Sequence, residues 1–255
     1  MKPAGLFSRN KIPQMPFLDL TELAVLIAAM AVFIFCDPFG LSYKITDFLR
    51  LRSALFIKEP RLLAYTYQSI GTLIAKTLAL LMIAALLAAK KTGLNENLAI
   101  RKPRSAAWRK LIIPFIVIAA CVRIYQSRDP LVPNLPIRMV FPEAMVIGNI
   151  LITGSILFVA PIAEELIFRG YMFDVLKRSF GAPASIGLTS ALFAAAHLPQ
   201  LNYELSGVAV IFAAGLFFAV MRQKEDSILV PVFFHAMYNL VYVVVGSANY
   251  LIVGY

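Results

Sequence analysis

Apolar residues run along this chain in long blocks, and polar residues fall mainly between the blocks. A helix needs about 20 apolar residues to cross the hydrocarbon core of a bilayer. The pattern therefore predicts an all-α, polytopic membrane helical bundle of about seven transmembrane helices with the active site inside the bundle. The predicted helices span residues 18–36, 65–89, 111–126, 145–172, 183–198, 206–222 and 228–252.

The composition agrees with a membrane protein. The chain has 255 residues, of which 60% are hydrophobic and 15% are charged, whereas soluble domains average roughly 45–50% apolar and about 25% charged residues. So few charges exclude a disordered protein, a soluble enzyme and a disulfide-stabilised secreted module. Cys36 and Cys121 both lie in apolar runs, so we expect buried thiols there rather than a disulfide or a metal site.

The net charge of +10 at pH 7 is also explained by a membrane. Lys and Arg are enriched in cytoplasmic loops, where they face anionic lipid. The larger share of these residues lies on one side of the predicted helices, and this side is cytoplasmic if the N-terminus is. We therefore expect an integral membrane protein with a cytoplasmic N-terminus and with anionic lipid at its basic loops. No nucleic-acid-binding pattern interrupts the apolar blocks, so nucleic acid is not an expected partner.

Ionisable and amide side chains also occur inside the predicted helices, where they are costly and by default mark function. Lys76 lies in the middle of the second block, and we interpret it as an interhelical partner of unknown role. The others lie in the C-terminal half and include both histidines of the protein: Glu164, Glu165, Arg169, His197, His235 and Asn239.

Helix geometry places some of these side chains on common faces. Residues four apart share a face, so His235 and Asn239 point the same way and Glu165 can pair with Arg169. The adjacent Glu164 and Glu165 are about 100° apart around a helix and cannot have the same role. The Glu165–Arg169 pair is interpreted as a structural, charge-neutral couple, which leaves Glu164 for chemistry.

A turn near Gly181 is expected to join two of the helices as an antiparallel pair. Glu164 lies 17 residues before this glycine and His197 lies 16 residues after it, so the two should lie at nearly the same depth. His235 is about ten residues from the polar turn at 222–226, or roughly 15 Å at 1.5 Å per residue. One carboxylate, two imidazoles and one amide at compatible depths indicate a hydrolytic site inside the membrane.

Three motifs carry a family resemblance. They are Glu-Glu-x-x-x-Arg at 164–169, Phe-x-x-x-His at 193–197 and His-x-x-x-Asn at 235–239. In this order, each in an apolar helix, they resemble the CPBP family of CAAX prenyl proteases and bacteriocin-processing or bacteriocin-immunity (Abi) proteins. The resemblance covers about residues 145–245 and implies an intramembrane endopeptidase.

The resemblance also implies an organisation and a substrate class. Residues 141–255 would form the catalytic helical core, and residues 1–140 would form variable N-terminal transmembrane helices, with residues 37–64 as an amphipathic segment in the membrane interface. The substrate would be a membrane-embedded or tail-anchored protein or peptide. The compact length indicates a prokaryotic inner (plasma) membrane, which argues against a prenylated substrate.

The residues can perform peptide hydrolysis without a cofactor. Glu164 would act as the general base on a water molecule that His197 shares and orients, and His235 and Asn239 would donate N–H groups to the oxyanion. The family is read in this way, as a glutamate-type protease. The predicted catalytic residues are Glu164, His197, His235 and Asn239, with Glu165, Arg169 and Phe193 in supporting roles.

Three alternatives remain open. Glu164, His197 and His235 could hold Zn²⁺ with water as the fourth ligand, although the chain has no His-Glu-x-x-His motif with ligands pre-spaced on one helix. A non-enzymatic immunity or binding protein could keep the fold, but its motifs would be broken and none is broken here. A transporter would favour an internal repeat, and none is detected.

Overall fold

The computed structural model describes residues 20–35, 60–89, 98–126, 153–198, 201 and 204–253. Within these ranges all regular structure is helical, and no strand occurs among them, which confirms the predicted all-helical class. The α-helices are α1 (Leu20–Phe35), α4 (Pro60–Ala89), α6 (Ile112–Gln126), α9 (Ala160–Glu165), α10 (Phe173–Ala196), α11 (Leu205–Glu225) and α12 (Leu229–Val253). Shorter helical segments are η1 (Ala107–Leu111), η2 (Ser155–Val159) and η3 (Leu166–Met172).

The helices coincide with the predicted apolar blocks. α10 begins at Phe173 and continues across a kink at Gly181, where a helix was predicted from residue 183, and α4 begins at Pro60 rather than at residue 65. Proline is well suited to the first turn of a helix because its missing N–H would have no partner there. The last residues of the predicted interfacial segment 37–64 therefore belong to α4, and residues 37–59 lie outside the described part of the chain.

The number of membrane crossings stays a prediction. Among the described residues, α11 is the helix that is long and apolar enough, by length and composition, to cross a membrane. Shorter apolar stretches occur at Leu20–Ala31, Lys76–Ala89 and Leu229–Val245.

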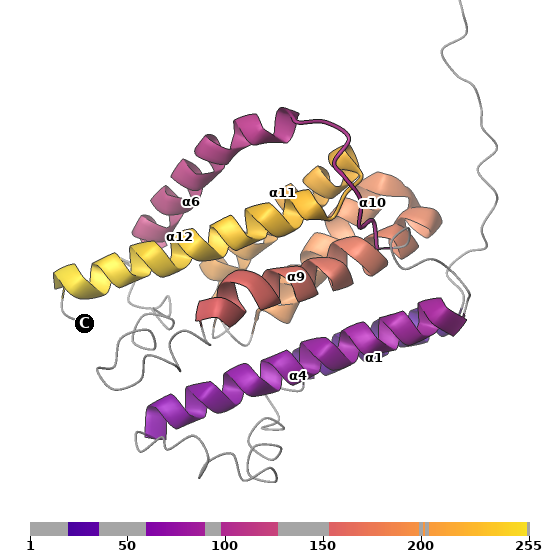
Figure 1. The fold of residues 1–255 in the computed structure, drawn as a ribbon, viewed down its shortest axis with the longest axis horizontal. Helices are drawn as coiled ribbons and strands as arrows, with labels where there is room; N and C mark the ends of the chain where they lie inside the picture. Colours follow the sequence, from indigo (N-terminus) through magenta and orange to yellow (C-terminus); the bar gives the residue numbers. More distant parts are fainter. Residues whose placement is uncertain are drawn as a thin grey trace, which may run out of the picture.

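The helices form a bundle in which the C-terminal helices lie between two outer layers (Figure 1). α1 runs beside α4, and α4 packs against α9 and η3. α10 pairs with α11, and α12 contacts α6, α11 and α9. Since α9 touches both α4 and α12, it lies at the meeting point of the bundle.

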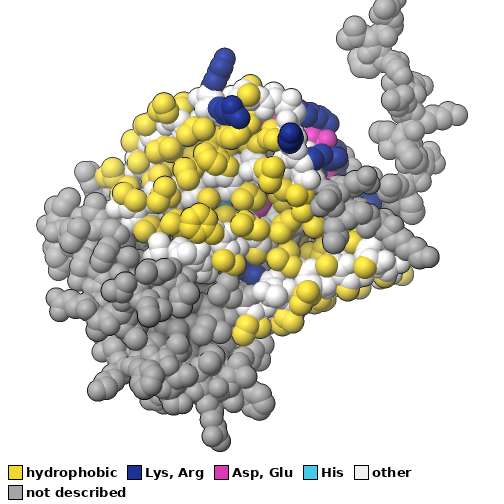
Figure 2. Space-filling model, in the orientation of Figure 1, with side chains coloured by type: hydrophobic (Ala, Val, Ile, Leu, Met, Phe, Trp, Pro, Cys, Tyr) yellow, Lys and Arg dark blue, Asp and Glu magenta, His cyan; other side chains and the backbone are white. Residues whose placement is uncertain are grey.

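The surface of the bundle is apolar and its interior contains charge. Large apolar side chains such as Ile113 (75% exposed) and Leu205 (80%) point outward, and yellow apolar atoms cover much of the described face in Figure 2. In contrast, Glu165 and Arg169 are fully buried. These two residues are paired with each other at 3.1 Å, as fully buried charges almost always are.

The prediction of a buried thiol at Cys121 is wrong, because this residue is exposed. The buried residues of α6 are Ala119, Arg123 and Gln126, which lie on one helical face. Cys121 lies two residues from Ala119 and therefore points away from that face. Cys36 lies outside the described residues.

Gly181 makes the turn that brings the two middle motifs together. Its dihedral angles, φ 79° and ψ 170°, belong to a region that is essentially restricted to glycine. The chain reverses there, so that the rings of Phe168 and Phe193 meet edge to face at 5.2 Å between centroids. The predicted antiparallel pair with a turn near Gly181 is confirmed.

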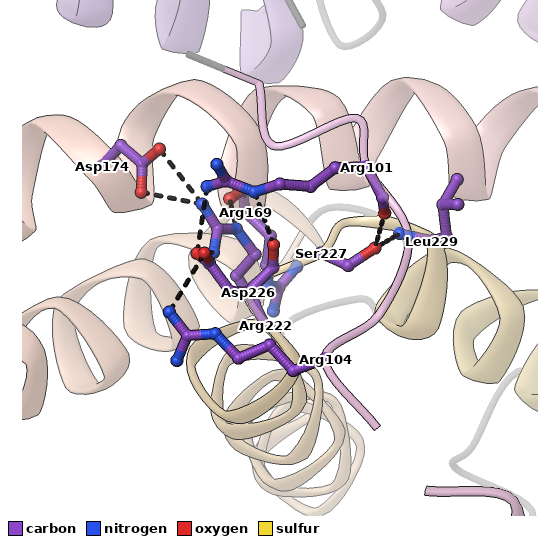
Figure 3. A network of polar contacts seen from close by, with 8 residues as sticks. All are labelled: Arg101, Arg104, Arg169, Asp174, Arg222, Asp226, Ser227 and Leu229. Carbon is purple, nitrogen blue, oxygen red and sulfur yellow. Dashed lines mark hydrogen bonds and ion pairs between the residues drawn. The ribbon is translucent and has the colours of Figure 1, made fainter. Parts of the chain in front are cut away.

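An ion-pair cluster fixes the turn between α11 and α12 (Figure 3). Asp226 Oδ1 accepts hydrogen bonds from Arg101 at 3.0 Å and from Arg222 at 3.1 Å, and its Oδ2 accepts one from Arg104 at 3.1 Å. Burial alone would raise the pKa of the Asp226 carboxyl, but the three arginines lower it below its usual value. The segment at 101–104 is thereby attached to the end of α11.

Arg222 connects this cluster to the rest of the bundle. It is 1% exposed, and its Nη2 donates to both carboxylate oxygens of Asp174 at 2.9 and 3.1 Å. Its Nε donates to the backbone carbonyl of Arg169 at 3.0 Å. Four elements, the 101–104 segment, η3, α10 and α11, are therefore held in register at one end of the bundle.

The conformation of Gly181 leads to a first prediction. Gly181→Ala should lower the free energy of unfolding by about 1–3 kcal/mol, because alanine must adopt a backbone conformation that a Cβ disfavours. Thermal unfolding of the detergent-solubilised protein measures this. The control is Gly187→Ala within α10, where an added Cβ meets nothing within 4 Å, so stability should stay the same or rise by about 0.5–1 kcal/mol. Equal effects of the two substitutions would contradict the argument.

Candidate active site

The two adjacent glutamates lie in a short helix, α9, between two π-helical segments. In η2 the N–H of Ala160 donates to the carbonyl of Ser155, five residues back. The next donor in this pattern would be residue 161, a proline, which has no N–H. Asn239 fills this gap, since its Nδ2 donates to the carbonyl of Ile156 at 2.8 Å.

Glu164 uses its two carboxylate oxygens differently. The residue is 4% exposed, and its Oε1 accepts a hydrogen bond from Lys76 Nζ at 2.7 Å. Its Oε2 has no hydrogen-bond partner among the described residues. This oxygen lies 3.6 Å from His197 Nε2 and 3.7 Å from His235 Nε2. One oxygen therefore faces a cation, and the other faces two imidazoles.

His197 ends α10, and its ring is oriented by the preceding helical turn. Its Nδ1 lies 2.7 Å from the carbonyl oxygen of Phe193. A carbonyl only accepts hydrogen bonds, so Nδ1 carries the proton. A neutral imidazole then has its lone pair on Nε2, the atom that faces Glu164. His197 is thus arranged to accept a proton or a hydrogen bond at Nε2.

His235 is oriented by the second glutamate. Its Nδ1 donates to Glu165 Oε1 at 2.8 Å, and its ring stacks on Phe218 at 5.1 Å between centroids. The hydrogen bond to Glu165 fixes the orientation of the ring, as the aspartate of a catalytic triad does for its histidine. His235 Nε2 is thereby directed at Glu164 Oε2, 3.7 Å away.

Arg169 neutralises Glu165 within the bundle. Its Nη1 donates to Glu165 Oε1 at 3.1 Å, and its Nη2 donates to the carbonyl of Gly215 at 3.0 Å. Its guanidinium lies 4.3 Å from the ring centre of Phe193, within the range of a cation–π contact. A Cβ at position 215 would lie 3.2 Å from Nη2, so glycine allows α11 to approach the arginine.

The structure brings three of the four predicted catalytic residues together. Glu164, His197 and His235 converge from α9, the end of α10 and α12. The described contact of Asn239 is with Ile156 rather than with these three, and it uses one of the two N–H bonds of the amide. The supporting residues Glu165, Arg169 and Phe193 pack around the histidines.

Two contacts were missed at the level of sequence. Lys76 was interpreted only as an interhelical partner, and its pairing with Glu164 spans 88 positions. Glu165 was matched with Arg169 from their spacing, but its bond to His235 spans 70 positions. A lysine inside an apolar block was the available signal for the first contact. Helical spacing carries no signal for pairs on different helices.

The part of the chain that carries the site is similar to known proteins. Residues 146–241 match the family model described as type II CAAX prenyl endopeptidase Rce1-like. An uncharacterised 24.3 kDa protein of Escherichia coli is 34% identical over 97 residues, which are 37% of this chain and 44% of that relative. The match therefore spans less than half of the curated relative. No solved structure matches the chain.

The matched segment contains Glu164, His197, His235 and Asn239, and ends before the last residues of α12. It includes neither α4 nor Lys76. Residues 146–241 of the chain, and with them all three motifs, match the Rce1-like family model of type II CAAX prenyl endopeptidases, in agreement with the CPBP resemblance that the motifs indicated.

Proposed function

We propose that this protein is an intramembrane endopeptidase that hydrolyses a peptide bond in a membrane-embedded or tail-anchored protein or peptide. One observation carries the proposal: a buried carboxylate oxygen, Glu164 Oε2, lies 3.6 and 3.7 Å from the Nε2 atoms of two histidines. These separations are too long for direct hydrogen bonds, so the carboxylate oxygen and both imidazole nitrogens face one another with their hydrogen-bonding capacity unused among the described residues. The match to a family of endopeptidases supports the same reaction class.

A water molecule between Glu164 and His197 would be activated by both. Oε2 and Nε2 are acceptors, so the water would donate one hydrogen to each and direct a lone pair at the substrate carbonyl. Glu164 takes the proton as the water oxygen bonds to the carbonyl carbon. The proton is then delivered, from Glu164 or through His197, to the leaving amine as the C–N bond breaks.

The tetrahedral intermediate carries negative charge, which requires hydrogen-bond donors. His235 would supply one through Nε2 when its ring carries a proton on both nitrogens, with Nδ1 bonded to Glu165. Asn239 would supply another through its second N–H, while the first remains bonded to Ile156. Fixing both groups before the reaction reduces the reorganisation needed when charge develops.

The setting of the reaction is proposed to be a prokaryotic inner (plasma) membrane, with a cytoplasmic N-terminus and anionic lipid at the basic loops. The exposed apolar side chains of the described helices support a lipid environment. In this arrangement residues 141–255 would form the catalytic core and residues 1–140 the variable helices. The glutamate mechanism would need no cofactor.

A zinc-dependent mechanism on Glu164, His197 and His235 is the second candidate. Each imidazole has its Nδ1 hydrogen-bonded and its Nε2 directed at one carboxylate oxygen, an orientation that metal-binding histidines use. Bound Zn²⁺ would supply an activated water. However, the Lys76 ammonium lies 2.7 Å from the same carboxylate and would repel a dication. This contact favours the glutamate mechanism.

Removing the ionisable group of Glu164 tests the proposal. Glu164→Gln and His197→Ala should each reduce the turnover of a membrane-associated peptide by at least about 10²–10⁴-fold, because water loses its base or its second acceptor. The probes are internally quenched peptides ending in Cys-aliphatic-aliphatic-X, with and without a farnesyl group, assayed in proteoliposomes. Comparing the membrane peptides of cells that carry wild type or Glu164→Gln would identify natural substrates.

Glu225→Gln is the matched control. Glu225 is 7% exposed and its carboxylate accepts hydrogen bonds from Ser105 rather than contacting the imidazoles. Its variant should retain turnover when the protein is folded. Near-wild-type turnover by Glu164→Gln would contradict the proposed base.

Metal content separates the two mechanisms. The glutamate mechanism predicts that the purified, active protein contains no stoichiometric zinc and keeps its turnover in 1,10-phenanthroline. Elemental analysis of the sample used in the peptide assay measures the first quantity. One zinc per chain, with chelator-sensitive activity that zinc restores, would instead support Glu164, His197 and His235 as ligands.

A further inference from the structure

Lys76 is a buried lysine in α4, outside the segment that matches the family model. It is 6% exposed, and its Nζ donates to Glu164 Oε1 at 2.7 Å. We propose that Lys76 is a positioning residue for catalysis, which anchors Oε1 of Glu164 and keeps Oε2 directed at the imidazoles. This inference rests on the proposed peptidase function and assigns a part of the active site to the N-terminal half of the chain.

The packing of α4 places Lys76 at the site. Ala79 and Ile83 follow it on the same face of α4, and both are almost fully buried, at 0% and 2% exposed. Residues three and seven positions apart share one helical face. α4 contacts α9 and η3. The Lys76 ammonium therefore reaches Glu164 from a helix other than the one that carries the glutamate.

The hydrogen bond determines which carboxylate oxygen is reactive. Lys76 engages Oε1, while Oε2 has no hydrogen-bond partner among the described residues and faces His197 and His235. A carboxylate anchored at one oxygen cannot rotate freely about its terminal bond. Lys76 therefore fixes the direction of the base toward the water position, which is a geometric contribution in addition to its charge.

The charge balance around Glu164 also depends on Lys76. The groups that face Glu164 are Lys76 from α4, His197 from α10 and His235 from α12. Within the same helical run, Arg169 compensates the neighbouring Glu165 at 3.1 Å. Among the described residues, Lys76 is the lysine or arginine that contacts the Glu164 carboxylate. Without it, the buried carboxylate would lose its salt-bridge partner, which is strongly destabilising.

The decisive measurement is the separate determination of kcat and KM for Lys76→Met, Lys76→Arg and wild type on the same peptide probe, per folded molecule. A residue that directs the base acts on the transition state, so its loss lowers kcat while KM stays near its wild-type value. In Lys76→Met kcat should fall about 10²-fold, the size of effect expected when a reacting group is misplaced by about 1 Å. Lys76→Arg keeps a charged donor for Oε1 and should recover part of this loss.

Lys177→Met is the control for removal of a positive charge elsewhere. Lys177 lies on α10, with its Nζ 6.0 Å from the ring centre of Phe173 rather than beside Glu164. Its kcat and KM should match wild type. A merely structural role for Lys76 would reduce the amount of folded enzyme without lowering kcat per folded molecule. An unchanged kcat in a folded Lys76→Met variant would overturn the inference while leaving the peptidase function intact.

A thermal-unfolding cycle tests the contact if Lys76→Met folds poorly. Removing the lysine leaves a buried, uncompensated carboxylate, which is strongly destabilising, and Glu164→Gln removes that charge. The double variant Lys76→Met/Glu164→Gln should therefore unfold at a higher temperature than Lys76→Met. Additive losses would overturn the inference. A wild-type enzyme that cleaves none of the probes or membrane peptides would refute the proposed function itself.

Discussion

The structure depends on compensating charge inside an apolar bundle. An ionised carboxylate that leaves water loses several kcal/mol of solvation unless a cation and hydrogen bonds replace it. Here Glu164 meets Lys76, and Glu165 meets Arg169 and His235. The partners Lys76 and His235 lie on other helices, so these contacts also restrict how α4 and α12 pack against α9. The same charge pairs therefore contribute to the packing of the bundle and to the geometry of the site.

Irregular backbone positions this compensation. Pro161 lacks the N–H that would continue the π-helical pattern, and Asn239 from α12 donates to the carbonyl that is left over. Gly181 reverses the chain, and Gly215 lets α11 approach Arg169. Proline and glycine weaken a regular helix, so these residues cost local helical stability. In the folded protein they allow α10, α11 and α12 to approach the segment that carries Glu164 and Glu165.

The two histidines differ through the acceptor on Nδ1. A backbone carbonyl from Phe193 holds His197 in the tautomer that accepts at Nε2. A carboxylate from Glu165 accepts the Nδ1–H of His235. The two imidazoles that face one carboxylate oxygen therefore differ in the charge of the group on Nδ1. In the proposed hydrolysis they would act as acceptor and donor, since water must lose a proton while the developing oxyanion must gain hydrogen bonds.

The sequence by itself determined the helical class, the helix positions, the turn at Gly181 and the four candidate catalytic residues. Those features depend on short-range rules: apolar block length, helical spacing and the conformational freedom of glycine. Nearly equal counts from Gly181 even predicted the meeting of Glu164 and His197. Only the tertiary structure decided that Lys76 pairs with Glu164, that Glu165 holds His235, and that Cys121 faces outward. Those outcomes depend on how helices far apart in sequence rotate and pack against each other, and the spacing within one helix contains no information about that rotation.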